Sequence, residues 1–589
     1  MCSMMSDGSQ KRRSQMNKNS RFWQTYFQKS LRFFLVFLVS LGASSVRKTV
    51  HAQLGPAFEK GQPRESFEFD SIRAYPVLDG GRIKPLESFA RETVLTITES
   101  RTLKGWEPMD LIFSWIAFPE FWEKKAIIKV GHQDIKRQLL LDQKRHWFSP
   151  LELKTNPALV QYATSAQVKG ATTPGNITKG APRQSDLKKV ISRLQLFSAF
   201  VSGEAWKVIP QSNESPWGTL AVGDTASDPK GIRVAFGALI KAYYEGNESQ
   251  FKMISKDLLE KRDQFLSTGR LRELDLEVHY QQFRPFKWAW ILYLIAALIW
   301  TFSVVLTRPR VRQVAFVTTC LGLAVHLYGF ILRVIITGRP PVSNMYETVI
   351  WVCFGVLLFG LIIYRLHRQS VIMATATALG AFGLIVADAA PAILDPHLHP
   401  LVPVLRSNLW LTIHVLTITI SYAAFALSLG LGNISLFYYY RKEPGYQSSV
   451  FKINHLMYRA MQFGVVLLAA GTILGGVWAD YSWGRFWGWD PKEVWALISL
   501  LCYLAILHGR FAGWVNAFGF AALSVIAFLS VVMAWYGVNF VLGAGLHSYG
   551  FASGGQQTVA VFCLIQLLYV GGAYYRYRFH SASKNSKIT

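Results

Sequence analysis

The stretch 286–306, FKWAWILYLIAALIWTFSVVL, decides how the rest of the chain is interpreted. It contains one charged side chain and is long enough, as an α-helix, to span the hydrocarbon core of a bilayer. Similar apolar runs continue to the C-terminus, at 313–337, 348–364, 370–388, 409–438, 460–479, 492–509, 515–538 and 557–576. With 51% hydrophobic and only 17% charged residues, the chain is predicted to be a mainly α, polytopic membrane protein with about nine transmembrane helices.

The short loops between these runs alternate in charge. The loops after the first, third, fifth, seventh and ninth runs carry Arg and Lys, as in TRPRVRQ at 307–313 and RLHRQ at 365–369. Short basic loops stay in the cytoplasm. The other loops, including the Trp-rich segment near residue 485, are therefore predicted to lie on the opposite side, which in a bacterial inner membrane is the periplasm.

The N-terminal half is divided by composition. Residues 1–52 hold a basic segment, a short apolar run and a candidate cleavage triplet at 50–52, as in a secretory leader. Residues 53–284 are mixed and polar, and we predict an exported, mostly helical α+β domain, with a turn and a helix start in AYPVLDGGRIKPLESFAR at 74–91. The transmembrane domain is then 285–580, followed by a cytoplasmic tail at 581–589.

The formal net charge of +26 does not indicate a nucleic-acid-binding protein. The excess lies in the leader, the polar domain and the short loops, where orientation signals and a basic surface account for it. Binding of the basic surface to anionic lipid or to an acidic partner stays an open alternative. No CxxC motif occurs among the five cysteines, so neither a redox pair nor zinc-ligand spacing is present.

The segment DYSWGRFWGWDPKEVWAL at 480–497 contains four tryptophans. Asp490, Pro491 and Glu493 fit the N-cap, N1 and N3 positions of a helix. The preceding rings would form a shelf for a planar apolar ligand such as a porphyrin. An ordinary aromatic belt at the membrane interface is the alternative, although it requires neither the glycines nor the cap. The shelf residues are Trp483, Gly484, Trp487, Trp489, Asp490 and Trp495.

Histidines within spans are the candidate ligands of a haem iron. His414 and His547 are expected at the periplasmic ends of their segments, near the shelf. His508 ends the helix that Asp490 begins, about 26 Å away, so the histidines indicate an outer and an inner site. Each has an alternative: His414 could be an ordinary hydrogen-bonding residue, His547 a loop residue, and His508 an end-of-helix residue favoured by the helix dipole. His326, in mid-span, is a weaker candidate, and His397 and His399 are expected to be solvated in a Pro-containing loop.

These motifs resemble a known family. WGRFWGWDPKEVWALI resembles the WWD signature of the haem-handling proteins CcsA (also called ResC), CcmC and CcmF. Three further segments, LWLTIHVLTITISYAAFALSL, LAILHGR and YGVNFVLGAGLHSYG, are similar to the His-bearing segments of CcsA, and GRPPVSNMYETVIW is similar to its early loop. The resemblance covers roughly 315–550.

The resemblance implies a role in cytochrome c biogenesis by System II, as a subunit of a holocytochrome c synthase. It implies that haem b crosses the membrane and is joined by thioether bonds to the CxxCH motif of apocytochrome c. It assigns His414 and His547 to the outer haem and His508 to the inner one. The second inner ligand would come from a ResB-like subunit, or from His326. A thiol-reducing protein outside the cytoplasm is a further expected partner.

Three rival interpretations stay open at this point. A CcmC/CcmF-type protein would deliver haem without attaching it. A transporter of another class would bind no haem. An assembly scaffold would tolerate loss of the candidate ligands.

Overall fold

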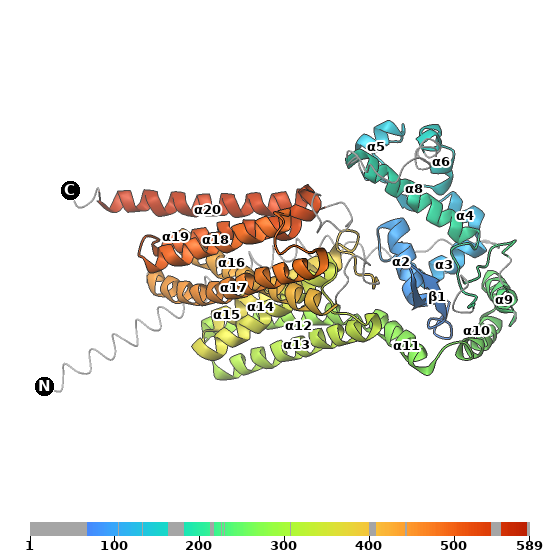
Figure 1. The fold of residues 1–589 in the computed structure, drawn as a ribbon, viewed down its shortest axis with the longest axis horizontal. Helices are drawn as coiled ribbons and strands as arrows, with labels where there is room; N and C mark the ends of the chain where they lie inside the picture. The colour runs from blue at the N-terminus through green and yellow to red at the C-terminus, as the bar shows by residue number, and fades with distance from the viewer. Residues whose placement is uncertain are drawn as a thin grey trace.

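The computed structural model describes residues 67–585, except 104, 132, 163–181, 212–216, 225–226, 229, 307, 400–407, 442–444 and 543–554. The predicted leader at 1–52 and the predicted ligand His547 lie outside the described residues. Figure 1 shows two parts, a bundle of long helices and a smaller, mainly helical N-terminal part at one end of it.

Nine helices in the described part of the chain are long and apolar enough to cross a membrane, which confirms the predicted polytopic class and the predicted number. Each agrees with one predicted apolar run. They are α12 (Pro285–Leu306), α13 (Pro309–Thr337), α14 (Met345–His367), α15 (Ser370–Ala389), α16 (Asn408–Arg441), α17 (Tyr446–Trp483), α18 (Pro491–Phe511), α19 (Ala517–Val532) with the π-helix η1 (Met533–Leu542), and α20 (Gln556–Asn585).

The ends of α17 differ from the prediction. The segment 446–459 was expected to be a cytoplasmic loop, but it forms the first turns of α17. Its polar residues have partners within the bundle: Asn454 accepts a hydrogen bond from Ser435 Oγ at 2.9 Å and donates to the carbonyl of Ala517 at 2.9 Å. Satisfied polar groups of this kind are compatible with a helix even where hydropathy is low.

The N-terminal part has its own apolar core, built mainly by aromatic side chains such as Phe113, Trp115 and Trp206. It is mostly helical with two small sheets, as predicted. Its elements are β1 (Pro76–Asp79), β2 (Arg82–Pro85), α2 (Leu86–Thr98), α3 (Pro108–Ala117), α4 (Pro119–Glu123), β3 (Ile128–Lys129), α5 (Gln133–Gln138), β4 (Trp147–Phe148), α6 (Pro150–Lys154), α8 (Pro182–Val201), α9 (Ile232–Glu245), α10 (Glu248–Asp263) and α11 (Thr268–Phe283).

The predicted turn and helix start at 74–91 are present. Strands β1 and β2 form an antiparallel hairpin with Asp79 opposite Arg82. Gly80 and Gly81 at its tip have φ of 59° and 76°, values that a two-residue type I′ turn requires and that glycine adopts without strain. Helix α2 then begins at Leu86.

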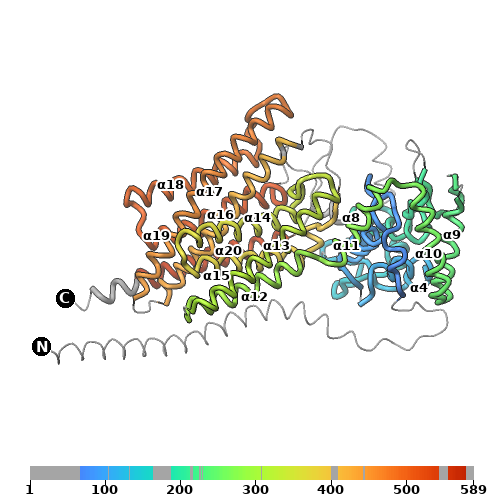
Figure 2. The backbone as a smooth tube through the Cα atoms, turned by 90° about the horizontal axis from the view of Figure 1, so that it is seen from below, coloured from blue at the N-terminus to red at the C-terminus, as the bar shows by residue number. Residues whose placement is uncertain are grey.

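Helix α11 joins the two parts. It leads into α12 through Arg284, whose φ is 51°, and Figure 2 shows α11 between the bundle and the N-terminal part. Charged contacts reinforce the junction. Arg82 of β2 binds Glu277 of α11 at 2.5 Å, and Asp388 of α15 binds both Arg101 and Arg284 at 3.1 and 3.0 Å.

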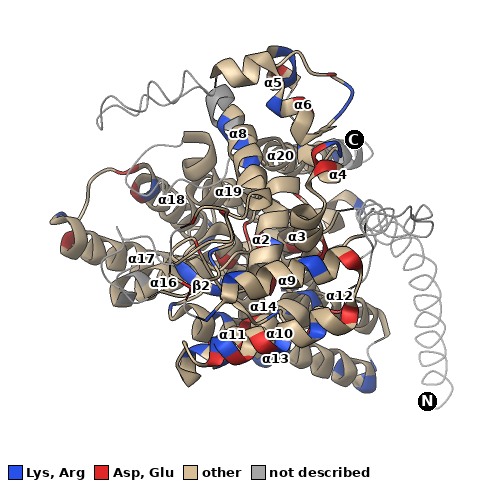
Figure 3. Cartoon of the chain, turned by 90° about the vertical axis from the view of Figure 1, so that its right-hand side faces the viewer, with Lys and Arg blue, Asp and Glu red and all other residues tan. Residues whose placement is uncertain are grey.

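Acidic and basic residues are interspersed on α10 and α11 (Figure 3). Several of them are paired, for example Lys261 with Asp257 at 2.8 Å and Arg270 with Glu273 at 2.6 Å. In the bundle, successive helices alternate in direction. The start of α12, the α17–α18 loop and the beginning of α16 therefore lie at the end of the bundle nearest the N-terminal part, which we call the domain-side end.

Candidate functional site

A cavity of about 160 Å³ lies at the domain-side end of the bundle. It is enclosed by the beginnings of α14, α16 and α18, the end of α17, and η1. The residues that matter for its chemistry are His414, Trp478, Phe486, Trp487, Lys492, Trp535 and Asn539. The cavity therefore brings together one predicted haem ligand, one predicted shelf residue and several residues that the sequence did not single out.

His414 lines this cavity from the second turn of α16. Its Nδ1 lies 2.8 Å from the carbonyl oxygen of Gly471 on α17. Because a carbonyl only accepts, Nδ1 carries the proton and the lone pair is on Nε2. Where an imidazole binds a metal, a carbonyl or carboxylate oxygen commonly accepts from its other nitrogen and orients the ring in this way.

Glycines of α17 make room for this ring. A Cβ atom on Gly475 would lie 2.5 Å from Cε1 of His414, and one on Gly476 would lie 2.6 Å from Cζ of Phe486. Neither distance is tolerable between carbon atoms. The two glycines therefore let the imidazole and the phenyl ring approach the backbone of α17 directly.

Trp478, also on α17, packs beside the imidazole. The two rings are nearly parallel, with 5° between their planes and 6.3 Å between centroids. Trp478 is only 1% exposed, and Trp483 meets its ring edge-on at 4.7 Å. The position of His414 is thus defined by a hydrogen bond, a glycine and an indole.

The predicted shelf residues take different positions. Trp487 lines the cavity, whereas Trp489 is 72% exposed and meets Trp487 edge-on at 6.0 Å. Trp483 is the last residue of α17 rather than a loop residue, since the helix ends where Gly484 adopts a φ of 70°. Trp495 lies on α18 and is half-buried.

The predicted helix start at Asp490 is confirmed. The Asp490 side chain accepts a hydrogen bond from the backbone of α18, and the Glu493 side chain accepts one from the Asp490 amide at 3.1 Å. The two bonds form a capping box, and Pro491 occupies the first position of the helix. Glu493 also accepts from the amide of Gly488 at 2.8 Å. The guanidinium of Arg485 occupies the space beside Gly488 that a Cβ atom would take.

Two polar atoms at the cavity lack a complement. Trp535 Nε1 and Asn539 Oδ1, both on η1, are buried and have no hydrogen-bond partner among the described residues. Lys492 also lines the cavity, and the Asp490 carboxylate attracts its ammonium group. A cationic and a hydrogen-bonding group in an otherwise apolar cavity suit a largely apolar ligand that carries an anionic group.

The predicted ligands His508 and His326 do not line this cavity, and they lie on different helices. His508 is near the opposite end of α18, exposed on the bundle surface, with Nδ1 2.8 Å from the carbonyl of Leu504. His326 is fully buried between α12 and α14 and hydrogen-bonds Tyr293 Oη at 3.0 Å. Figures 1 and 2 place α13 and α18 on opposite sides of the bundle.

The expectation that His397 and His399 are both solvated is wrong for His397. Its side chain is 14% exposed, and its Nδ1 lies 2.9 Å from Asp395. His399, 52% exposed, contacts the other oxygen of Asp395 at 2.8 Å. Burial alone would raise the pKa of the Asp395 carboxyl, but its bonds to both imidazoles hold this pKa well below its usual range. Burial alone would lower the pKa of His397, but Asp395 raises it.

Comparison with known proteins identifies relatives of the helical bundle. Residues 342–547, which include the cavity, match the family model described as cytochrome C assembly protein. The cytochrome c biogenesis protein CcsA of Prochlorococcus marinus strain MIT 9301 is 33% identical over 270 residues, covering 41% of this chain and 85% of that protein. The chain belongs to the CcsA family of cytochrome c biogenesis proteins.

A second similarity extends beyond the bundle. Protein NrfI of Wolinella succinogenes is 28% identical over 491 residues, which cover 80% of this chain and 53% of NrfI. The residues from 268 onward are little more than half of this CcsA-family chain, so the match must include part of its N-terminal domain. The chain spans about half the length of NrfI.

Proposed function

We propose that this CcsA-family chain relays haem b across a bacterial inner membrane and presents it at the domain-side cavity for covalent attachment to apocytochrome c. Haem is the substrate in this proposal. The domain-side end would face the periplasm, as the positions of the basic loops favour. The observation that carries the proposal is the hydrogen bond from His414 Nδ1 to Gly471, because it fixes the tautomer that coordinates iron through Nε2.

His414 and His547 would be the two axial ligands of the outer haem. The assignment of His547 rests on the family resemblance. Lys492 lines the cavity and would pair with a haem propionate, and Trp535 Nε1 would donate a hydrogen bond to it. Trp487 would cover part of the apolar face of the porphyrin.

Attachment at this site needs mainly proximity and orientation. Each cysteine thiol of a CxxCH peptide adds across one vinyl group: the sulfur–carbon bond forms at the carbon next to the ring, and the proton goes to the terminal carbon. No oxidant is consumed. The thiols must arrive reduced, which gives a role to a thiol-reducing partner outside the cytoplasm.

His508 would be one ligand of an inner haem. Its exposure on the bundle surface supports a second ligand from another subunit, which we propose is ResB-like. His326 suits this role less well, because it is enclosed by Phe286, Phe330 and Phe354 on the opposite side of the bundle (Figure 1). The N-terminal domain would dock this subunit or the apocytochrome.

The test is to co-express the chain with a ResB-like subunit and a CxxCH reporter, and to purify it. The wild type should show a haem absorption spectrum and yield holocytochrome. His414→Gly, His547→Gly and His508→Gly should each lose most of the yield at normal protein levels. His279→Gly is the matched control, because His279 lies on α11 and bonds Tyr328, away from both sites.

The outcomes of this experiment distinguish the three alternative functions from the proposed one. Haem binding without holocytochrome, with only the ResB-like subunit present, would favour a CcmC/CcmF-type delivery protein. Absence of haem from the purified wild type would favour a transporter of another class. Normal yield from all three glycine variants would leave an assembly scaffold.

A further inference from the structure

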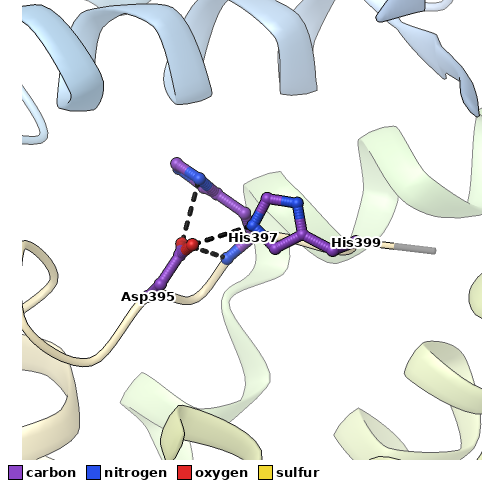
Figure 4. A group of neighbouring side chains, drawn as sticks. All are labelled: Asp395, His397 and His399. Atoms are coloured by element: carbon purple, nitrogen blue, oxygen red, sulfur yellow. Dashed lines mark hydrogen bonds and ion pairs between the residues drawn. The ribbon is translucent and has the colours of Figure 1, made fainter. Parts of the chain in front are cut away.

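A second group of potential ligands lies in the loop between α15 and α16, outside the haem-binding cavity. Figure 4 shows the carboxylate of Asp395 between the imidazoles of His397 and His399. The distances are 2.9 Å to His397 Nδ1 and 2.8 Å to His399 Nε2, and the three ligand atoms all lie within 4.8 Å of one another. The amide of His397 also donates to Asp395 Oδ1 at 3.0 Å, which fixes the carboxylate further.

The backbone of this loop is held by buried side chains of the bundle. Arg333 donates to the carbonyl of Pro396 at 3.1 Å, and Arg339 donates to that of His399 at 2.7 Å. Asn344 donates to the carbonyl of Asp395 at 3.3 Å. Three anchors on the segment 395–399 hold its backbone in place before any ligand arrives, which reduces the entropy that binding would cost.

The anchoring arginines do not leave a strongly positive site. Both share one carboxylate: Glu347 is 2.6 Å from Arg333 and 3.0 Å from Arg339. Their nitrogens donate to carbonyl oxygens, to Glu347 and to Tyr280 Oη. In the described part of the chain, the ion-pair partners of Asp395 are its two imidazoles.

We propose that Asp395, His397 and His399 bind a divalent first-row transition metal, for which Zn²⁺ is the appropriate probe. Two imidazoles and a carboxylate suit such ions, whereas Mg²⁺ and Ca²⁺ prefer oxygen ligands. Ligand bonds of about 2.0–2.2 Å to tetrahedral zinc separate the ligand atoms by roughly 3.4 Å. The two spacings between Asp395 and the imidazole nitrogens, 2.9 and 2.8 Å, need to open only slightly, and water would take the remaining position. The exposed side of His399 provides an entry path.

The position of this site distinguishes it from the haem-binding cavity. His397 lines a separate, smaller cavity together with Glu92 of α2 and Tyr280 of α11. A bound metal would fix the loop where the bundle meets the N-terminal domain. The inference does not depend on the proposed haem relay, because none of the three ligands belongs to the haem-binding residues.

The test is equilibrium dialysis of the full-length protein in detergent, after removal of any affinity tag, against micromolar free Zn²⁺. Bound metal per chain is counted by mass spectrometry. The wild type should bind one Zn²⁺ more than Asp395→Asn or His399→Gln, because loss of a ligand lowers affinity by at least about tenfold. Asp395→Asn is isosteric and His399 is exposed, so both variants should fold.

Two controls complete the experiment. His279→Gln and His414→Gly should bind as much Zn²⁺ as the wild type, and the second separates this site from the haem site. Equal zinc uptake by the wild type and both ligand variants would overturn the proposal. Equal affinity of the wild type for Zn²⁺ and Mg²⁺ would also overturn it, because it would indicate a nonspecific anionic site.

Discussion

The imidazole of His414 and the indole of Trp478 lie parallel, 6.3 Å apart between ring centroids. The plane of an axial imidazole stands perpendicular to a porphyrin. Trp478 would therefore support the face of the His414 imidazole and limit rotation of this ring, rather than stack on the haem. In the proposed function it would act through His414, as a positioning residue.

Trp478→Leu should weaken haem binding without abolishing it. Aromatic pairs contribute about 0.5–1.5 kcal/mol beyond their buried area, which corresponds to roughly a 2–10-fold loss of affinity. Haem titration followed by absorbance measures it. Trp288→Leu is the control, because Trp288 lies on α12, is 49% exposed and does not line the cavity, so its loss should change affinity little. Equal losses in the two variants would contradict the positioning role.

Gly475→Ala should displace the His414 ring and greatly reduce haem retention. The added methyl group would lie 2.5 Å from the imidazole, so either the ring or α17 must move. Gly571→Ala is the matched control, since a Cβ atom there meets nothing within 4 Å. Haem content per purified chain is the measurement. A normal haem spectrum in Gly475→Ala would show that haem binding does not depend on the present position of the His414 ring.

Much of this architecture follows from local physics. The hydrocarbon thickness sets the length of an apolar run, so the nine spans could be counted directly. The Asp490 cap and the turn at Gly80 and Gly81 were predictable because a few neighbouring residues determine them. In these cases the sequence contains the whole interaction.

The remaining features depend on residues far apart in the chain. Trp478, Trp535 and Asn539 line the cavity because α17 packs on α16 and η1 packs on α18, and hydropathy does not report which face of a helix meets which neighbour. One signal was available: GTILGG at 471–476 places small residues where another element approaches closely. The π-helical turn that orients Asn539 has no comparable sequence signature.

Asp490→Ala should destabilise the start of α18 by about 1 kcal/mol, because it removes the N-cap of a capping box. Asp490→Ser retains a cap and should restore most of that stability. Thermal unfolding in detergent measures the difference. If the serine variant is stable but loses haem as fully as the alanine variant, the negative charge of Asp490 contributes to the site beyond capping.

Glu347→Gln should destabilise the domain-side end of the bundle strongly, by about 3–5 kcal/mol. Glu347 is the carboxylate shared by the buried Arg333 and Arg339, so its loss leaves two buried cations without a counter-charge. Asp388→Asn is the control: Asp388 also binds two arginines, but it is 29% exposed, and water can replace it. A smaller effect of Glu347→Gln than of Asp388→Asn in thermal unfolding would contradict this ranking.

The ion pairs of Glu99 should make the stability of the N-terminal domain depend on pH in the acid range. Glu99 ends α2 and binds Arg193 of α8 at 2.5 Å and Lys129 of β3 at 3.1 Å. Burial alone would raise the pKa of the Glu99 carboxyl, but Arg193 and Lys129 lower this pKa below the usual value of 4.5. A carboxylate with a depressed folded-state pKa stabilises the fold above its unfolded pKa, and this stabilisation is lost as the pH falls through the folded-state pKa.

Wild type should therefore exceed Glu99→Gln in stability by about 1 kcal/mol at neutral pH, and the difference should shrink as the pH falls below about 4.5. Unfolding followed by tryptophan fluorescence across this range measures both. Glu68→Gln is the control, because the pair of Glu68 with Lys252 is more than half exposed and such pairs contribute little. A difference in stability between wild type and Glu99→Gln that stays constant down to pH values well below 4 would show that charge pairing is not its source.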